Sequence, residues 1–317
     1  MNFNATMKVL FICSQKVETK ISPFVKAQAT AIEDLGWEVS FFLIEKKGFL
    51  GYLLGVYQLR KFRRKNHFDI YHAHYSFCGY VASLAGCRPL VVSLLGSDVL
   101  KNAFWRSVTR FFYKIFNWNS LIVKSEEMKQ LLKLKKVEVV PNGVNLSTFY
   151  PVPRLESRTK LGWEMEEKII LFNGHKNNFV KNYSLASSVV SQLPFEAKMM
   201  EIKGLTQENL NLMYNACDVF LSTSLWEGSP NTIKEAMACN TNIVATEVGD
   251  ISFLFGKNSK NQSCSFNFDD IRNSLIKILD ESPINDGRER IIQLKLDSIS
   301  VAKKITTLYE HSLGPKP

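Results

Sequence analysis

Residues 218–247 read DVFLSTSLWEGSPNTIKEAMACNTNIVATE, and this stretch decides how the chain folds. The apolar run at 219–221 predicts a buried strand, which ends in small polar residues and a Gly-Ser-Pro turn. The pattern then changes to a helix and returns to a second apolar run, "NIVAT". A strand, a helix and a second strand in this order predict a parallel, doubly wound sheet.

The same alternation recurs along the chain on both sides of a Pro-containing linker at residues 145–153. Helical patterns lie between most of the apolar runs. We therefore expect an α/β protein with two Rossmann-like, doubly wound domains, whose ligands bind beyond the carboxyl ends of the strands. The predicted strands lie at residues 7–12, 37–44, 68–74, 89–96, 120–125 and 136–143, and after the linker at 168–174, 196–202, 218–223 and 241–247.

Charge is distributed unevenly between the two halves of the 317-residue chain. Residues 1–150 carry 21 Lys and Arg against 10 Asp and Glu, which gives +11, and the remaining 19 bases and 20 acids give −1. This asymmetry indicates that the halves meet different partners. The six cysteines form no C-x-x-C pair, so reduced cytosolic thiols are expected instead of a disulfide framework or a metal site. No apolar run approaches the roughly 20 residues of a membrane-spanning helix.

The turn at residues 227–231 has the chemistry of an anion site. Ser229 suits a helix N-cap, and Pro230 suits the first helical position, where its missing N–H costs nothing. The free N–H groups of the first turn favour a phosphate or diphosphate, and Gly228 allows close approach of the backbone. Glu235 can accept hydrogen bonds from a ribose and Glu227 from a sugar. A capping carboxylate and a solvated glutamate are the alternative interpretation.

Beyond this turn, E-G-S-P-N-x-x-K-E-A-M-A resembles the E-x7-E signature of the family 4 glycosyltransferases, which have the GT-B fold. Further segments resemble that family in the expected order: "FDIYHAHYSFCGYVASLAG", "PLVVSLLGSDVL", "LIVKSEEM", "VVPNGVNLSTFYP" and "DGRERI". The resemblance implies two domains facing each other across a cleft. The first is residues 1–147, joined by a returning helix at about 299–314, and the second, donor-binding domain is residues 148–298.

The resemblance also implies roles for individual residues. Glu227 would bind donor-sugar hydroxyls, Glu235 the nucleotide ribose, and Lys181 the departing diphosphate, whose growing negative charge needs compensation. His74 would lie near the transferred sugar. The remaining implied residues are the diphosphate-binding backbone of Gly228, Ser229, Pro230 and Asn231, and the acceptor-side pair Ser97 and Asp98.

Two departures from the family pattern are visible. Many relatives have an arginine shortly before the lysine at position 181, whereas this chain reads "NGHKNNFVKN", so Lys176 or His175 would substitute. The Gly-Gly loop common after the first strand is replaced by "CSQKVETKISPFVKAQ". Contacts from the first domain to the donor phosphates are therefore in question.

Some of these residues have simpler interpretations. Because side chains alternate between the faces of a strand, we expect His72 and His74 to meet different surroundings, one the cleft and one the core, and not to share a metal ion. Asp98 is expected either to act on the acceptor side or only to cap a helix.

The expected activity is transfer of a hexose from a nucleotide diphosphate sugar to a glycan or lipid-linked saccharide, in cell-surface polysaccharide or lipopolysaccharide synthesis. The resemblance implies retention of configuration without a metal ion or cofactor. Alternatives are another GT-B enzyme, such as a nucleotide-sugar epimerase, or a basic membrane-associated sugar-nucleotide-binding protein without catalysis. Nucleic acid is not an expected partner, because no recognised binding motif accompanies the charge.

Two segments of the first domain mix basic with aromatic and aliphatic residues, at positions 48–68 and 101–118. Either their apolar side chains pack inward and their bases are solvated, or they form a face that lies on anionic lipid. The charge asymmetry favours the second interpretation, so we expect a cytoplasmic protein held peripherally at the inner face of the cell membrane.

Overall fold

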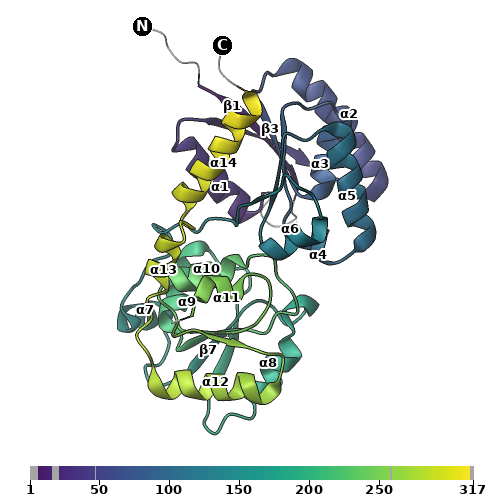
Figure 1. Ribbon diagram of the computed structural model, residues 1–317. Helices are drawn as coiled ribbons and strands as arrows, with labels where there is room; N and C mark the ends of the chain where they lie inside the picture. The colour runs from purple at the N-terminus through teal and green to yellow at the C-terminus, as the bar shows by residue number, and fades with distance from the viewer. Residues whose placement is uncertain (1–5, 16–20, 47, 258, 315–317) are drawn as a thin grey trace. The chain divides into compact units, whose positions relative to one another are not determined.

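The computed structural model describes residues 6–15, 21–46, 48–257 and 259–314. The chain divides into two compact units, Met1–Gly143 with Ser298–Pro317 and Val144–Asp297. Each unit is built on its own parallel sheet (Figure 1), so the expected α/β fold of two doubly wound domains is confirmed. Among the described residues, no helix is long and apolar enough to cross a membrane.

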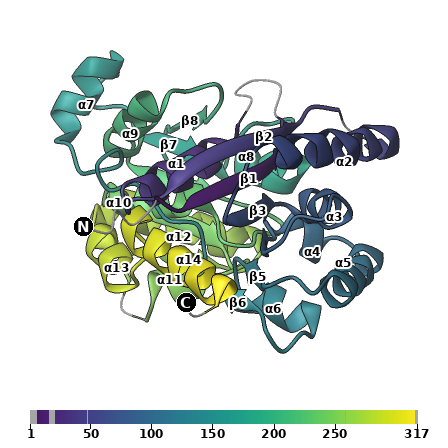
Figure 2. The same ribbon diagram turned by 90° about the horizontal axis from the view of Figure 1, so that it is seen from above.

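The N-terminal unit has a sheet of order β2-β1-β3-β4-β5-β6, and all of its described strand pairs are parallel. One face is covered by α1 and α14, which pack together, and α2, α3 and α5 lie on the other (Figure 2). The strands are β1 (Lys8–Ser14), β2 (Glu38–Ile44), β3 (Ile70–His74), β4 (Leu90–Ser93), β5 (Ser120–Val123) and β6 (Glu138–Val139). The helices are α1 (Pro23–Glu33), α2 (Gly48–Lys65), α3 (Ser76–Leu84), α4 (Ser97–Leu100), α5 (Ala103–Phe116), α6 (Glu126–Leu132) and α14 (Ser298–Leu313).

Helix α14 follows the whole second unit in sequence, yet its side chains complete the core of the first. Tyr309 is fully buried against Trp37, with ring centroids 5.2 Å apart. Its hydroxyl also lies 2.5 Å from Nδ1 of His72, the central residue of β3. The N-terminal unit is therefore assembled from two segments that are distant in sequence.

The C-terminal unit has a parallel sheet of order β11-β10-β9-β7-β8. Its three central strands, β7, β9 and β10, are short and fully buried, as expected for a sheet covered on both faces, whereas the edge strands β8 and β11 are partly exposed. The strands are β7 (Ile169–Phe172), β8 (Lys198–Glu201), β9 (Val219–Ser222), β10 (Ile243–Thr246) and β11 (Gln262–Cys264). The helical segments are α7 (Arg154–Leu161), η1 (Phe179–Lys181), α8 (Tyr183–Val190), α9 (Gln207–Ala216), α10 (Asn231–Ala238), α11 (Ile251–Phe255), α12 (Phe268–Glu281) and α13 (Gly287–Gln293).

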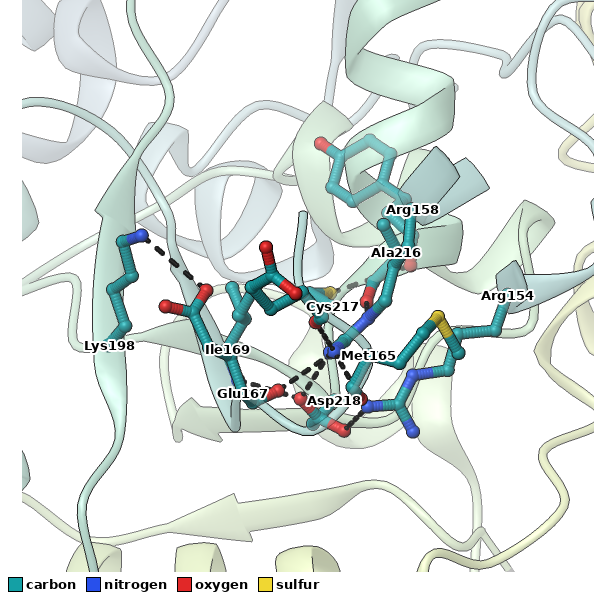
Figure 3. A network of polar contacts seen from close by, with 11 residues as sticks. Arg154, Arg158, Met165, Glu167, Ile169, Lys198, Ala216, Cys217 and Asp218 are labelled. Atoms are coloured by element: carbon teal, nitrogen blue, oxygen red, sulfur yellow. Dashed lines mark hydrogen bonds and ion pairs between the residues drawn. The ribbon is translucent and has the colours of Figure 1, made fainter. Parts of the chain in front are cut away.

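A buried arginine ties the amino ends of this sheet together (Figure 3). The Arg158 side chain is 0% exposed, and its Nη2 donates to Asp218 at 2.9 Å. Asp218 in turn accepts from the backbone N–H of Ile169 at 2.6 Å and pairs with the more exposed Arg154 at 2.5 Å. The other donors of Arg158 reach the carbonyl groups of Glu164, Met165, Glu167 and Ala216, at 2.6–2.9 Å.

Candidate functional site: a donor motif and a histidine pocket

The donor motif lies beyond the carboxyl ends of β7 and β9, where a doubly wound sheet places its ligands. Hydrogen bonds fix these ends to each other. The Asn173 amide donates to Ser222 at 2.8 Å and accepts from Thr232, in the first turn of α10, at 2.8 Å. Thr223 donates to the carbonyl groups of Lys181 and Asn182, at 2.9 and 3.0 Å. The loop after β7 and the loop after β9 are therefore held side by side.

Lys181 and Glu227 form the ion pair that results from this arrangement. The Lys181 Nζ lies 2.7 Å from the Glu227 Oε1, and both side chains are 18% exposed. Gly174 leaves room for the lysine side chain, because a Cβ at this position would come within 2.8 Å of the Lys181 Cγ. The φ of +131° at Gly174 also disfavours any residue other than glycine. The sequence places these two charges 46 positions apart, and the fold brings them into contact.

Gly249 supports the turn that carries Glu227. Its φ is +63°, and a Cβ at this position would come within 2.7 Å of the Glu227 carbonyl oxygen and 2.9 Å of that of Gly228. The loop after β10 thus packs backbone to backbone against the turn. Any larger residue at position 249 would displace the carboxylate of the ion pair.

Helix α10 begins one residue later than expected. Pro230 is the N-cap residue, with an extended ψ of 119°, and Asn231 is the first helical residue. The expected N-cap role of Ser229 is therefore wrong: its hydroxyl accepts from the Lys234 Nζ at 3.0 Å instead of capping the helix. The first turn of α10 thus carries a buried cation, the Lys234 side chain.

Glu235 and Lys234 give the motif an unusual charge environment. Burial raises the pKa of Glu235 to about 7, although the Tyr214 hydroxyl, which donates to it at 3.3 Å, and Lys234 act in the opposite direction. Burial lowers the pKa of Lys234 to about 8, although Asp250 and Glu235 counteract it. Burial also raises the pKa of Asp250 to about 6. Perturbed groups that cluster in this way mark candidate functional sites.

Sequence reasoning missed Lys234 and Asp250. The sequence did contain a signal for Lys234, namely the helical period of its apolar neighbours. Ile233, Ala236 and Met237 surround the lysine on the helix, so a turn of α10 that buries them also places Lys234 in the interior. In the structure the Lys234 side chain is fully buried.

Lys176, the expected substitute for an arginine, is exposed in the loop after β7. Its backbone N–H donates to Glu201 at 2.8 Å, and His175 Nε2 lies 3.7 Å from the same carboxylate. A role for the Lys176 side chain in donor binding stays a prediction.

In the N-terminal unit, His74 ends β3 and lines a pocket of about 420 Å³. Its Nε2 atom is buried and has no hydrogen-bond partner among the residues that the structure describes. Burial, with a smaller effect of Lys124, lowers the pKa of His74 to about 3, so the ring is neutral. A buried ring nitrogen without a partner is available to a ligand hydroxyl. The pocket is also lined by Ser14, Gln15, Tyr52, Tyr75 and Ser97.

The reasoning that placed His72 and His74 on opposite faces is wrong. Residues two apart in a strand share a face, and the two rings stack with centroids 4.2 Å apart. Their surroundings nevertheless differ, because Ser93 and Tyr309 hold both nitrogens of His72 inside the core, while His74 meets the pocket. No group of three or more His, Cys, Asp or Glu among the described residues is placed to hold a metal ion.

Asp98 is buried and holds the loop after β4. Its carboxylate accepts from the backbone N–H groups of Leu95, Gly96 and Ser76, at 2.9–3.3 Å. Neither α3 nor α4 has a side-chain N-cap bond, so Asp98 holds the loop backbone and does not act as an N-cap residue. Ser97 lines the His74 pocket, and an acceptor-side role for Asp98 stays a prediction. The structure thus brings the donor residues together in one unit and His74 with Ser97 in the other. That both groups act on one pair of substrates stays a prediction.

Comparison with known protein families matches both units. The model described as Glycosyltransferase Family 4 matches residues 21–148, and the one described as Glycosyl transferases group 1 matches residues 153–280. A D-inositol 3-phosphate glycosyltransferase of Mycobacterium ulcerans is 26% identical over 245 residues, covering 62% of this chain and 52% of its own length. The chain thus spans about half the length of the curated relatives it first matches.

Other similar proteins cover more of the chain. An Escherichia coli UDP-Gal:alpha-D-GlcNAc-diphosphoundecaprenol alpha-1,3-galactosyltransferase is 22% identical, covering 80% of this chain and 76% of its own. Among solved structures, sucrose-phosphate synthase of Thermosynechococcus elongatus superposes with a TM-score of 0.83 at 18% identity, covering 96% and 98% of the two chains. Anabaena HepE, in complex with UDP-glucose, gives 0.74 at 16% identity, covering 95% and 98%. These structures have the same fold, so the expected GT-B architecture is confirmed.

Proposed function

The chain belongs to the family 4 glycosyltransferases, and we propose that it moves a hexose from a nucleotide diphosphate sugar to a saccharide hydroxyl with retention of configuration. The ion pair of Lys181 and Glu227, beside the start of α10, carries this proposal. The bond from the anomeric carbon to the diphosphate breaks, a bond to the acceptor oxygen forms, and the hydroxyl proton leaves with the diphosphate. In this scheme Lys181 compensates the departing charge, and no metal ion or cofactor takes part.

The remaining residues have complementary roles in this proposal. The turn Gly228–Asn231 binds the diphosphate through backbone N–H groups, Glu235 accepts from the ribose, and Glu227 accepts from the sugar. His74 offers its unpartnered Nε2 to a hydroxyl of the transferred sugar. Product analysis with and without an acceptor distinguishes transfer from an epimerase reaction.

Donor binding is expected to depend on pH through Glu235. Ribose hydroxyls donate hydrogen bonds, so they need the ionised carboxylate, which is lost as the pH falls below the pKa of about 7. The affinity for a sugar nucleotide should therefore fall by up to about tenfold per pH unit below 7. The measurement is titration calorimetry with UDP-glucose between pH 5.5 and 7.5, because its diphosphate diester does not titrate there. GDP- and ADP-glucose are measured in parallel, to identify the base.

The matched control is Glu235→Gln, which keeps the shape of the side chain. It should bind weakly at pH 7.5 and lose most of the pH dependence, leaving only the contribution of Asp250 near pH 6. Equal pH dependence in the variant and the parent would remove Glu235 from the donor site. Failure of all three nucleotides to bind would reject the proposed function.

For the acceptor we propose a lipid-linked or growing surface saccharide, presented at the inner face of the membrane. Support comes from helices α2 and α5, which carry eight basic residues and no acid. Not all of these bases are free, because Arg60 and Arg63 donate to the carbonyl groups of Leu84 and Ala85, at the end of α3. The exposed bases Lys61, Arg64 and Lys65 are therefore the better candidates for contact with lipid.

Vesicle sedimentation tests this attraction. The protein should pellet with anionic but not with neutral vesicles, and should be released as the salt is raised from 0.1 to 1 M, which shortens the Debye length from about 10 to about 3 Å. A Lys61→Ala, Arg64→Ala, Lys65→Ala triple variant should lose much of the binding, since each cation contributes roughly 1 kcal/mol. Equal sedimentation with both kinds of vesicle, or with neither, would show that these bases are solvated and do not bind anionic lipid.

A further inference from the structure

An apolar groove lies on the N-terminal unit, between α2 and α5. Helix α3 packs against both and lies between them (Figures 1 and 2), so it forms the floor. The groove measures about 520 Å³, within the usual range of 300–1,000 Å³ for small-molecule sites. Its walls and floor include Tyr52 and Val56 of α2, Phe77 and Tyr80 of α3, and Trp105 and Val108 of α5.

The described residues that line the groove present almost entirely apolar surface, which suits hydrocarbon. Phe77 packs on Trp105 with ring centroids 4.6 Å apart, and Tyr80 packs on Phe112 at 4.4 Å. The Tyr80 hydroxyl is already bonded to Thr109 at 2.7 Å, so this ring presents apolar surface only. A ligand held here gains by removing hydrocarbon from water, and not by hydrogen bonding.

The groove adjoins the pocket of His74, whose mixed lining includes the polar side chains of Ser14, Gln15 and Ser97. Tyr52 lines both cavities, and its ring stacks on Phe77, with centroids 5.1 Å apart and an interplanar angle of 23°. A pocket with several polar side chains in its lining shares one wall with an apolar groove, and this arrangement matches a ligand with a polar head and a hydrocarbon chain. A free sugar would occupy the first cavity and leave the second empty.

The charge of the two wall helices indicates that the ligand is anionic. Neither helix that forms the walls carries an acidic residue, while their exposed bases include Arg64 on α2 and Lys114 on α5. The positive charge of these two helices attracts an anionic amphiphile. The exposed apolar side chains beside the groove, Leu50, Leu53 and Phe104, extend the surface that hydrocarbon can cover.

We propose that this groove binds the hydrocarbon chain of an anionic lipid-linked acceptor whose saccharide occupies the His74 pocket. The inference rests on the proposed function and specifies its acceptor: the enzyme recognises the lipid itself, and is not merely held near it by charge. Tyr52 marks the boundary between the head and the chain.

Trp105 provides a direct readout, because bromine quenches tryptophan fluorescence only at close range. The probe is a series of alkyl phosphates with brominated chains, used below the concentration at which they form micelles. Each added methylene should tighten binding up to about fourfold until the groove is full. Quenching should saturate in the parent protein and largely disappear in Trp105→Phe, which separates this tryptophan from the others.

Two variants of matched chemistry decide the outcome. Val108→Phe fills the groove and should abolish quenching, whereas Ile115→Phe makes a comparable change at an exposed position of α5 outside the groove and should leave it intact. Val56→Phe, on the opposite wall, serves as a second filling variant if Val108→Phe does not fold.

Equal quenching in the filled variants and the parent would overturn the inference, as would its absence at every chain length. If UDP-glucose still binds in calorimetry while no alkyl phosphate does, the groove assignment fails and the proposed function stands. A groove that another protein covers, instead of a lipid chain, would give this combination of UDP-glucose binding without alkyl phosphate binding.

Discussion

Replacement of Lys181 by methionine is expected to lower the rate of sugar transfer by about 100- to 1,000-fold, the effect of removing one preorganised group that stabilises developing charge. The lysine lies 2.7 Å from Glu227 and is largely shielded from water, so its charge is fixed before the donor arrives. Methionine keeps the unbranched stem that passes Gly174 and removes only the cation. The measurement is kcat and KM for donor hydrolysis or transfer, with the melting temperature as a check on folding.

Two comparisons make this result specific. Lys176→Met removes an exposed cation from the loop after β7. If Lys176 does not take the role of the arginine found in many relatives, the rate of sugar transfer should change little. His74→Ala should lower kcat by more than it weakens the binding of UDP-glucose, because its proposed place is beside the reacting sugar. A Lys181→Met enzyme that keeps its kcat would show that another group compensates the diphosphate.

Replacement of Arg158 by methionine should destabilise the C-terminal unit by about 3–5 kcal/mol, the usual cost of removing one partner of a buried ion pair. The guanidinium serves one carboxylate and four carbonyl groups, and methionine leaves all of them without this donor. Hydrogen exchange of peptides from β7 and β9 measures the loss, and peptides from β1 and β3 provide an internal reference in the other unit.

Arg154→Met is the natural control, because Arg154 binds the same Asp218 from a position that is 44% exposed. It should cost no more than about 1 kcal/mol, as exposed pairs do. Similar losses in the two variants would show that Asp218, and not the buried guanidinium, carries the stability.

The doubly wound fold was predictable because its strands are apolar runs that end in small or polar residues. The signal at residues 218–223 becomes β9 (Val219–Ser222), and that at 241–247 becomes β10 (Ile243–Thr246). The Arg158 network was not predictable, because most of its acceptors are backbone carbonyl groups, which every residue possesses. Only the fold decides which of them gather around one side chain.

The site was predictable where the family resemblance supplies the motif: it placed Lys181 and Glu227 in one donor site, although their direct ion pair was not predicted. It was missed where a charge is buried against expectation. Lys234 belongs to the quoted motif, yet its burial and its bond to Ser229 depend on the packing of α10. The error over His72 and His74 does not depend on the fold. Residues two apart in a strand lie on the same face, so their shared face was predictable from the sequence.

The packing of α14 in the N-terminal unit has a consequence for biosynthesis. During translation residues 144–297 are synthesised before Ser298–Leu313, so the N-terminal unit, although begun first, is completed last. Until then β3 lacks Tyr309, and His72 has no partner at Nδ1. At about 5–20 residues per second, some 150 residues of elongation separate β6 from α14 and leave a hydrophobic sheet face uncovered for roughly 8–30 seconds. We therefore expect nascent chains of this protein to bind ribosome-associated chaperones during this interval.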